Sequence, residues 1–523
     1  MKTFLIFIAG ISLTLAATGQ DLQPPQARTR NGMVQGYFDG GDVRVFAGIP
    51  YALPPVGELR WREPQPMTNW DGIRPADHFG DRPMQPTLWK DMIFRSAHMS
   101  EDCLYLNVWT PATGTNLPVL VYFHGGGLVA GDGSEPRYDG SAFARQGIVV
   151  VTVNYRLGIF GFFAHPELTK ESLHHASGNY GYLDQNAALR WVQANIPAFG
   201  GDPGKVTIGG QSAGAFSVSL QMVSPLSRGL FRGAIAQSGS HLGQKSTPTL
   251  AEVEQSWVKF ATNLGAPTLK ELRRIPADRL LEASRNYKGT DTQTLIDGYF
   301  LTEEPQEVFF TGRQADVPLL AGWTTAEVDY HSLLGNEEPT SENFQAKVRE
   351  LYGNQADRVL KLYPSANVAE ARQSATDLAS DRFLAYRTWK LIDEMWKSGG
   401  QPVYRYLWAQ IPPRAKDVPD PAPGTPPPQG AAHSSELPYV FGALDRITAI
   451  QWAPADYQAS EVIHDYFANF IRTGDPNGEG LPRWPWFQAS SPKVMLIDAH
   501  PHTIAEPNLR RYQLLDELLP TAQ

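Results

Sequence analysis

Cysteine is almost absent from this chain of 523 residues, in which Cys103 is the only one. No disulfide can therefore form within the chain, and its stability must come from a packed interior. Apolar residues make up 42% of the sequence and charged residues 19%, which is ordinary globular composition. A chain of this length can bury a large hydrophobic core without cross-links.

Long hydrophobic runs are also scarce. The run Phe4 to Leu15 is too short to span a bilayer, and no other stretch is long enough. This run follows Lys2 and precedes the small residues Ala16-Ala17-Thr18-Gly19, which is the composition of a secretory signal peptide. We therefore expect residues 1–19 to be a signal peptide and the protein to be secreted or periplasmic.

An excess of positive charge and phosphate-binding loops are missing too. The formal net charge of −9 argues against nucleic acid as a partner, and no basic amphipathic helix suggests stable insertion in a membrane. Neither G-x-x-x-x-G-K-[ST] nor G-x-G-x-x-G occurs, which argues against a nucleotide-binding loop. No repeat of 20–50 residues is present, so a repeat architecture is not expected.

The stretch Lys205 to Ala215 carries the clearest functional pattern. The β-branched run Val206-Thr207-Ile208 precedes Gly210-Gln211-Ser212-Ala213-Gly214, which has the pattern G-x-S-x-G, and an amphipathic segment follows. A strand that turns sharply into a helix with a serine at the turn is the nucleophile elbow of α/β-hydrolases. The serine would sit at a helix N-terminus, which favours negative charge. A simple Gly/Ser turn is the alternative, since the pattern also occurs by chance.

A second glycine pattern lies upstream. The apolar run Pro118 to Phe123 ends in His124-Gly125-Gly126-Gly127. This HGGG pattern supplies oxyanion-hole amides in lipases and esterases. Each such N–H group stabilises the charge of a tetrahedral intermediate, and the loss of one costs about 3 kcal/mol. A glycine-rich surface loop is the alternative, but the position after a hydrophobic strand argues against it.

A serine nucleophile needs an acid and a histidine downstream, in the order Ser, acid, His. The chain has 12 histidines, of which His433 follows a long irregular segment and precedes an apolar cluster. The apolar run Val317 to Gly322 predicts a buried strand, and catalytic groups gather at the carboxyl ends of parallel strands. Position alone leaves both Glu327 and Asp329 as candidates for the acid. The histidine pairs elsewhere have no further ligands at structural-site spacing, so no metal site is expected.

Several segments resemble the type-B carboxylesterase/lipase family, which includes the cholinesterases. The run Glu101-Asp102-Cys103-Leu104-Tyr105-Leu106-Asn107-Val108 is similar to one signature of the family. Gly200-Gly201-Asp202-Pro203, leading into the Ser212 motif, is similar to the other. Further matches along the chain are Phe46 to Tyr51, Asn154 to Gly158, Gly178 to Gln185 and Thr473 to Asn477.

The resemblance implies an α/β-hydrolase fold, with a mostly parallel central sheet flanked by helices and large helical insertions over the active site. It implies a single domain over residues 20–523. The roles that it assigns are Ser212 as nucleophile, Glu327 rather than Asp329 as acid, His433 as base, Gly126, Gly127 and Ala213 as oxyanion donors, and Ser238 as a support of the triad. Animal members pair the cysteine that matches Cys103 with one a short way upstream, where this chain has Met84.

The function implied is a serine carboxylic-ester hydrolase that acts through an acyl-enzyme on small to medium esters. Its partner would be a small-molecule ester, and neither a metal nor an organic cofactor is required. A lipase with a mobile lid is the alternative among enzymes. A cholinesterase-like binding protein is the alternative from another class, although such relatives have typically lost the serine or the histidine. The ester itself and the oligomeric state stay open.

The pattern of apolar residues also predicts individual elements. An N-terminal antiparallel hairpin is expected over residues 27–48 and a helix over 182–196. Arg60 and Glu101 are expected to form a buried ion pair, because buried charges are normally paired. The expected strands of the main sheet are 117–123, 147–154, 206–208, 233–237, 317–322, 402–408 and 493–497, and the expected helical insertions are 247–297 and 335–381.

Overall fold

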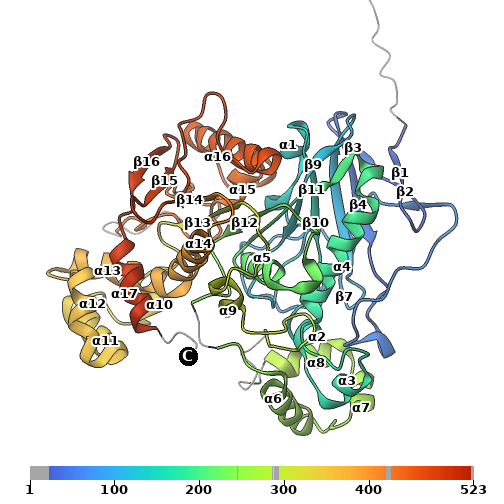
Figure 1. The fold of residues 1–523 in the computed structure, drawn as a ribbon, viewed down its shortest axis with the longest axis horizontal. Coiled ribbons are helices and arrows are strands. Elements are labelled where there is room, and N and C mark those ends of the chain that lie inside the picture. Colours follow the sequence, from blue (N-terminus) through green and yellow to red (C-terminus); the bar gives the residue numbers. More distant parts are fainter. Residues whose placement is uncertain (1–22, 244–245, 286, 288–293, 420–425, 520–523) are drawn as a thin grey trace, which may run out of the picture.

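The computed structural model describes residues 23–519 apart from 244–245, 286, 288–293 and 420–425. The predicted signal peptide lies outside the described residues. The centre of the fold is a sheet of eleven strands that crosses the molecule (Figure 1). In spatial order these are β16 (His502–Ala505), β15 (Lys493–Ile497), β14 (Val403–Trp408), β13 (Leu319–Thr324), β12 (Gly233–Gln237), β11 (Gly201–Gln211), β9 (Leu117–Phe123), β10 (Val149–Val153), β8 (Tyr105–Pro111), β4 (Val43–Pro50) and β3 (Tyr37–Asp39).

The middle of this sheet is parallel and its margins are antiparallel. Strands β10, β9, β11, β12, β13, β14 and β15 run parallel to one another, while β8, β4, β3 and β16 pair antiparallel. The carboxyl ends of the parallel strands therefore meet at one edge of the sheet, where catalytic groups are expected. The predicted mostly parallel α/β sheet is confirmed.

Side chains of the central strands alternate between two hydrophobic cores, because successive residues of a strand point to opposite faces. In β9, Val119 and Val121 join one core, which α4 and α5 cover, and Leu120 and Tyr122 join the other, which α16 covers. Both faces are buried, as expected for parallel strands rich in valine and isoleucine.

Helices connect and cover the strands. The helices are α1 (Ser141–Arg145), α2 (Gly158–Phe162), α3 (Pro166–Glu171), α4 (Tyr180–Asn195), α5 (Ala213–Val223), α6 (Leu250–Asn263), α7 (Leu269–Arg274), α8 (Ala277–Arg285), α9 (Pro305–Phe310), α10 (His331–Leu334), α11 (Ser341–Tyr352), α12 (Ala356–Leu362), α13 (Val368–Ser380), α14 (Tyr386–Ser398), α15 (Leu437–Val440), α16 (Pro454–Thr473) and α17 (Leu509–Leu518). None of the helices in the described ranges is long and apolar enough to cross a membrane.

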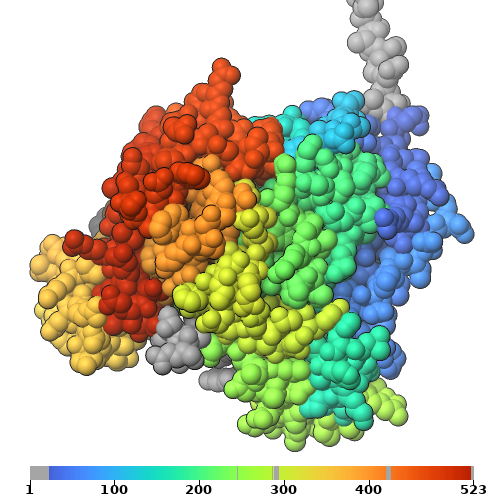
Figure 2. Space-filling model, in the orientation of Figure 1, coloured from blue at the N-terminus to red at the C-terminus, as the bar shows by residue number. Residues whose placement is uncertain are grey.

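Both expected insertions are helical. Helices α6, α7 and α8 lie beside α2 and α3, and α11, α12 and α13 lie beside α17 around an apolar cluster that includes Phe344 and Tyr363 (Figure 1). The two groups occupy separate margins of the face in Figure 2. A π-helical turn, Asp381–Ala385, follows α13, and the preceding Ser380 exchanges hydrogen bonds with the backbone of Val328. The second insertion therefore reaches the edge of the sheet that carries Glu327.

The N-terminal part has two hairpins in different sheets where one was expected, and the expected Arg60–Glu101 ion pair is present. The predicted hairpin region forms two antiparallel pairs, β1 (Gln26–Arg28) with β2 (Met33–Gln35), and β3 with β4. Arg60 and Glu101 form a bidentate ion pair with N···O distances of 2.6 and 2.5 Å. Cys103 is a free, buried cysteine, and Met84 is buried in the same apolar cluster.

Candidate active site

Ser212 occupies a strained turn between β11 and α5. Its backbone has φ +55° and ψ −123°, a conformation that a non-glycine residue adopts only when its surroundings impose it. The Ser212 N–H donates to the carbonyl of Gln237 at the end of β12, 2.8 Å away, and its carbonyl accepts from the first turn of α5. The strand on one side and the helix on the other therefore fix the turn.

The two glycines of the G-x-S-x-G motif are required by close backbone contacts. A Cβ on Gly210 would lie 2.4 Å from the carbonyl carbon of Gly214, and a Cβ on Gly214 would lie 2.0 Å from the carbonyl oxygen of Phe123. Any side chain at these positions would push α5 away from β11 and β9. The motif thus brings the start of α5 directly over the carboxyl end of β9.

The glycine loop follows β9 and lies against Ser212. A Cβ on Gly125 would be 3.3 Å from the Ser212 Cβ, and Gly126 and Gly127 have φ of +107° and +62°. Within the described residues, the N–H groups of Gly126, Gly127 and Ala213 donate no hydrogen bond. Three free donors next to Ser212 are what an oxyanion hole requires.

The imidazole of His124 supports the shape of this loop. Its ring stacks on Tyr155 with centroids 4.4 Å apart, and the Tyr155 hydroxyl donates to the His124 carbonyl at 2.7 Å. Burial lowers the pKa of His124 to about 4, so the ring is neutral at neutral pH. Tyr155 is fully buried and therefore holds the loop from beneath.

Glu327 and His433 form a close pair at the same edge of the sheet. The His433 Nδ1 lies 2.5 Å from Glu327 Oε2, and the other carboxylate oxygen accepts from Ser238 Oγ at 2.6 Å and from the Thr324 N–H at 2.8 Å. The Glu327 side chain is fully buried and that of His433 is 25% exposed. A buried carboxylate with all these donors is fixed in orientation, and the imidazole with it.

The structure separates the two acidic candidates that position alone left open. Asp329 points away from this pair, and its carboxylate lies 3.1 Å from Nδ1 of His331. The Asp329 side chain is 64% exposed, in contrast to the buried Glu327. Asp329 and Glu327 are thus only two positions apart in the sequence, but Asp329 is solvated and Glu327 contacts His433.

Charges around His433 favour its protonated form. Burial alone would lower the pKa of His433, but the charge and hydrogen bond of Glu327, together with Glu436, raise it above its ordinary value. Glu436 is itself buried, and this burial together with the charge of Glu327 raises its pKa to about 7. His433 is thus a better base than a solvated histidine, and its neutral form requires a correspondingly higher pH.

Ser212 and His433 share no hydrogen bond, although both are among the described residues. The side chain of Gln211 instead lies beside the imidazole, with its Nε2 atom 3.1 Å from His433 Nε2. In hydrolase sites without substrate, catalytic hydrogen bonds often form only in the complex. Sequence reasoning assigned no role to Gln211, and the only signal was a polar side chain at the end of an apolar strand.

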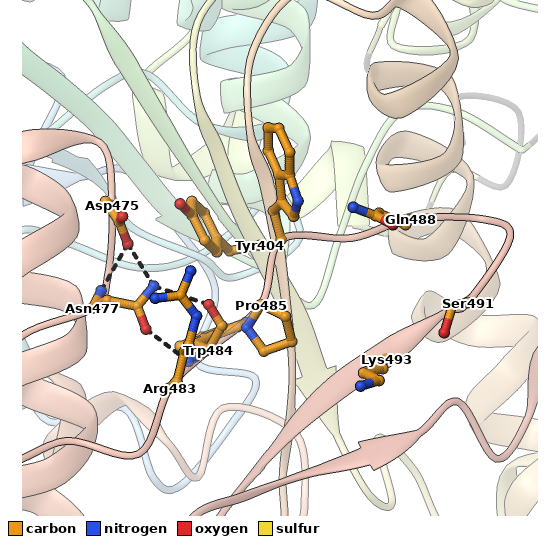
Figure 3. A pocket seen from close by; sticks show the side chains of 10 residues that line it. Tyr404, Asp475, Asn477, Arg483, Trp484, Pro485, Gln488, Ser491 and Lys493 are labelled. Atoms are coloured by element: carbon orange, nitrogen blue, oxygen red, sulfur yellow. Dashed lines mark hydrogen bonds between the residues drawn. The ribbon is translucent and has the colours of Figure 1, made fainter.

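The hollow drawn in Figure 3 lies elsewhere, at the amino ends of β14 and β15. Its lining residues are Tyr404, Asp475, Asn477, Arg483, Trp484, Pro485, Trp486, Gln488, Ser491 and Lys493. Asp475 and Asn477 form hydrogen bonds that tie the surrounding loop to Trp484.

Within the described part of the chain, no three His, Cys, Asp or Glu residues are grouped so that they could hold a metal ion.

Comparisons with known proteins agree with this geometry. Residues 23–515 match the model of the carboxylesterase family. The chain belongs to the carboxylesterase family. It is 34% identical over 496 residues to a fumonisin B1 esterase of Sphingopyxis macrogoltabida, covering 92% of this chain and 88% of that protein. It is also 34% identical over 506 residues to the para-nitrobenzyl esterase of Bacillus subtilis strain 168, covering 93% and 97%.

A human cocaine esterase is 35% identical to this carboxylesterase over 525 residues, covering 92% of this chain and 90% of that protein. A solved structure of PNB esterase superposes with a TM-score of 0.79 at 32% identity, covering 95% of this chain and all of that one. This carboxylesterase is accordingly an α/β-hydrolase and a serine ester hydrolase. The expectations of family, fold and ester hydrolysis are confirmed. The alternative, a non-catalytic binding protein, has no support in these comparisons.

The two acidic candidates can be compared directly. We expect Glu327→Gln to lower kcat about 10³- to 10⁴-fold, because an amide removes the charge and allows the wrong imidazole tautomer. Asp329→Asn should change kcat less than about threefold, since Asp329 does not contact His433. Kinetics on one soluble ester, with circular dichroism as the control for folding, measure both. If kcat falls strongly in Asp329→Asn but stays nearly normal in Glu327→Gln, the assignment of the acid is reversed.

Proposed function

We propose that Ser212, His433 and Glu327 form the catalytic triad of this esterase. Ser212 Oγ attacks the ester carbonyl, and Nε2 of His433 takes its proton. The carboxylate of Glu327 holds the proton on Nδ1 and stabilises the imidazolium that forms. The observation that carries the proposal is the contact of His433 with the buried Glu327, next to the turn at Ser212, whose neighbour Gln211 contacts the imidazole.

The remaining steps follow from the same groups. The N–H groups of Gly126, Gly127 and Ala213 bind the oxyanion of the tetrahedral intermediate. His433 returns its proton to the departing alcohol, which leaves an acyl-enzyme on Ser212. Water that is deprotonated by His433 then attacks the acyl-enzyme, and His433 returns the proton to Ser212 Oγ as the acid leaves. Ser238 contributes to these steps indirectly, because its hydroxyl donates to Glu327 and fixes the orientation of that carboxylate.

Ser212→Ala tests the proposal. We expect turnover of a soluble aryl ester to fall to a residual rate about 10³- to 10⁴-fold above that in water, which oxyanion binding alone supplies. The melting temperature should stay close to that of the wild type, because Ala adds no atom to the turn. Retention of more than about a tenth of the wild-type kcat by the folded variant would remove Ser212 from the mechanism.

The surroundings of the triad favour esters with apolar groups. Trp89 and Phe383 are each 44% exposed, yet a Cβ on Gly127 would lie 3.8 Å from the Trp89 ring, and the Phe383 ring is 5.7 Å from that of His433. One aromatic ring therefore lies at the glycine loop and another at the proposed base. Relatives are named as a fumonisin B1 esterase, a cocaine esterase and a para-nitrobenzyl esterase, so esterases of this family differ in their substrates. We propose small to medium carboxylic esters as substrates.

A lid-gated lipase is the second candidate, and one observation favours it. Leu88, Trp89 and Ile93 are large, exposed apolar residues on one segment beside the glycine loop. Such a segment could contact an emulsified ester.

Rates on para-nitrophenyl esters of increasing acyl length separate the two candidates. We expect kcat/KM to be highest for short and medium chains and to show no jump as long-chain substrate passes its solubility limit. A steep rise at that limit would favour the lipase.

We also propose that the enzyme is exported to the periplasm or the medium by residues 1–19. The support is their composition, a charged Lys2 before an apolar run and then small residues. Intact-mass measurement of the protein from cell fractions tests this. The mature chain should begin near residue 20 and be found outside the cytoplasm, and an uncleaved cytoplasmic chain would contradict the proposal.

A further inference from the structure

Each carbonyl in the first half of the glycine loop accepts a hydrogen bond. The carbonyl of His124 accepts from the Tyr155 hydroxyl at 2.7 Å, and the carbonyl oxygen of Gly125 lies 2.8 Å from Nδ1 of His124. The carbonyl of Gly126 accepts from two N–H groups further along the same loop, at 3.0 and 2.9 Å. The acceptors of this segment are therefore used, while the N–H groups proposed to bind the oxyanion stay free.

A carbonyl that is held in this way fixes the direction of the N–H group in the same peptide. The peptides of this loop are trans, and in a trans peptide the C=O and N–H bonds point in opposite directions. The carbonyl of Gly125 shares its peptide with the N–H of Gly126. The bond between His124 and Gly125 therefore decides where the Gly126 N–H points.

The imidazole of His124 is suited to hold this carbonyl. A carbonyl oxygen can only accept, so Nδ1 of His124 carries the proton of the bond. Nε2 is buried and has no hydrogen-bond partner among the described residues, which favours the neutral ring with its one proton on Nδ1. A Cβ on Gly131 would lie 2.4 Å from this Nδ1 atom and 2.5 Å from the Gly125 oxygen, so the backbone of Gly131 covers the bond.

We infer that His124 is a positioning residue, whose Nδ1–H group holds the peptide between Gly125 and Gly126 so that the Gly126 N–H faces the oxyanion. This inference rests on the proposed oxyanion hole. Without the imidazole donor, the peptide loses a bond that opposes its rotation. A carbonyl turned toward the reacting oxygen would repel the negative charge that an N–H group stabilises.

An ester and its thiono analogue together measure the strength of an oxyanion hole. Sulfur is a weak hydrogen-bond acceptor, so the N–H donors assist attack on a C=O group more than attack on a C=S group. Loss of a donor lowers the ratio of the two kcat/KM values. A displaced Ser212 or His433, or partial unfolding, lowers both values alike and leaves their ratio unchanged.

His124→Asn and His124→Leu form a matched pair for this measurement. Both remove the ring that stacks on Tyr155, and Asn and Leu have similar shapes, but only Asn has an N–H donor near the position of Nδ1. One oxyanion donor contributes about 10²- to 10³-fold to kcat, so we expect His124→Leu to lower the ratio about tenfold or more. His124→Asn should keep the ratio within about threefold of the wild type, because its amide can hold the Gly125 carbonyl.

The control is His464→Leu, which removes a similar bond away from the glycine loop. His464 is also buried, its Nδ1 donates to the carbonyl of Val440 at 2.8 Å, and its ring packs on Phe143. Its ratio should equal that of the wild type even if the melting temperature falls. If His124→Leu does not fold, His124→Phe, which keeps an aromatic ring but has no donor, replaces it under the same criterion.

Two results would overturn the inference. One is an unchanged ratio in the folded variant without a donor, and the other is a ratio that falls equally in His124→Asn. The wild type shows whether the oxyanion hole itself is at fault. If Ser212 of the wild type reacts with a fluorophosphonate but the enzyme prefers the ester no more than hydroxide ion in water does, the proposed hole fails and the inference falls with it.

Discussion

The strained backbone of Ser212 is the constraint on which the active site depends. A positive φ at a serine is intrinsically unfavourable by about 1–2 kcal/mol, so the surrounding structure has to impose it. The bond from the Ser212 N–H to Gln237 and the close contact of Gly214 with Phe123 do so from both sides. The buried parallel sheet is what holds β9, β11 and β12 in the register that these contacts need.

The same sheet brings together residues that are more than a hundred positions apart. The Thr325 N–H donates to Trp408 at the end of β14, and the Ala326 N–H donates to Ala431. These bonds place the segment before Glu327 beside the segment before His433, so that the proposed acid and base meet. Glu327 in turn is held by Ser238, which follows β12 directly. Ser212, Ser238 and Glu327 therefore take their positions from the carboxyl ends of β11, β12 and β13, and His433 takes its position from the pairing of Ala431 with Ala326.

Much of this arrangement could be predicted from the sequence, because it is encoded locally. The G-x-S-x-G and HGGG motifs each follow an apolar strand, and close backbone contacts require their glycines wherever the motif folds in this way. The choice between Glu327 and Asp329 could not be made from position, because it depends on which side chain turns inward. The resemblance supplied that choice, and the buried contact with His433 gives its physical basis.

The contact between Gln211 and His433 could not be predicted, because it joins side chains 222 positions apart whose meeting depends on the whole fold.

The structure of a phosphonate adduct of the enzyme tests most directly the central claim, that Ser212 is the nucleophile and the glycine loop binds the oxyanion. We expect phosphorus bonded to Ser212 Oγ, and one phosphonyl oxygen about 3 Å from the N–H groups of Gly126, Gly127 and Ala213. Phosphorus on another residue, or an oxygen turned away from those three groups, would contradict it.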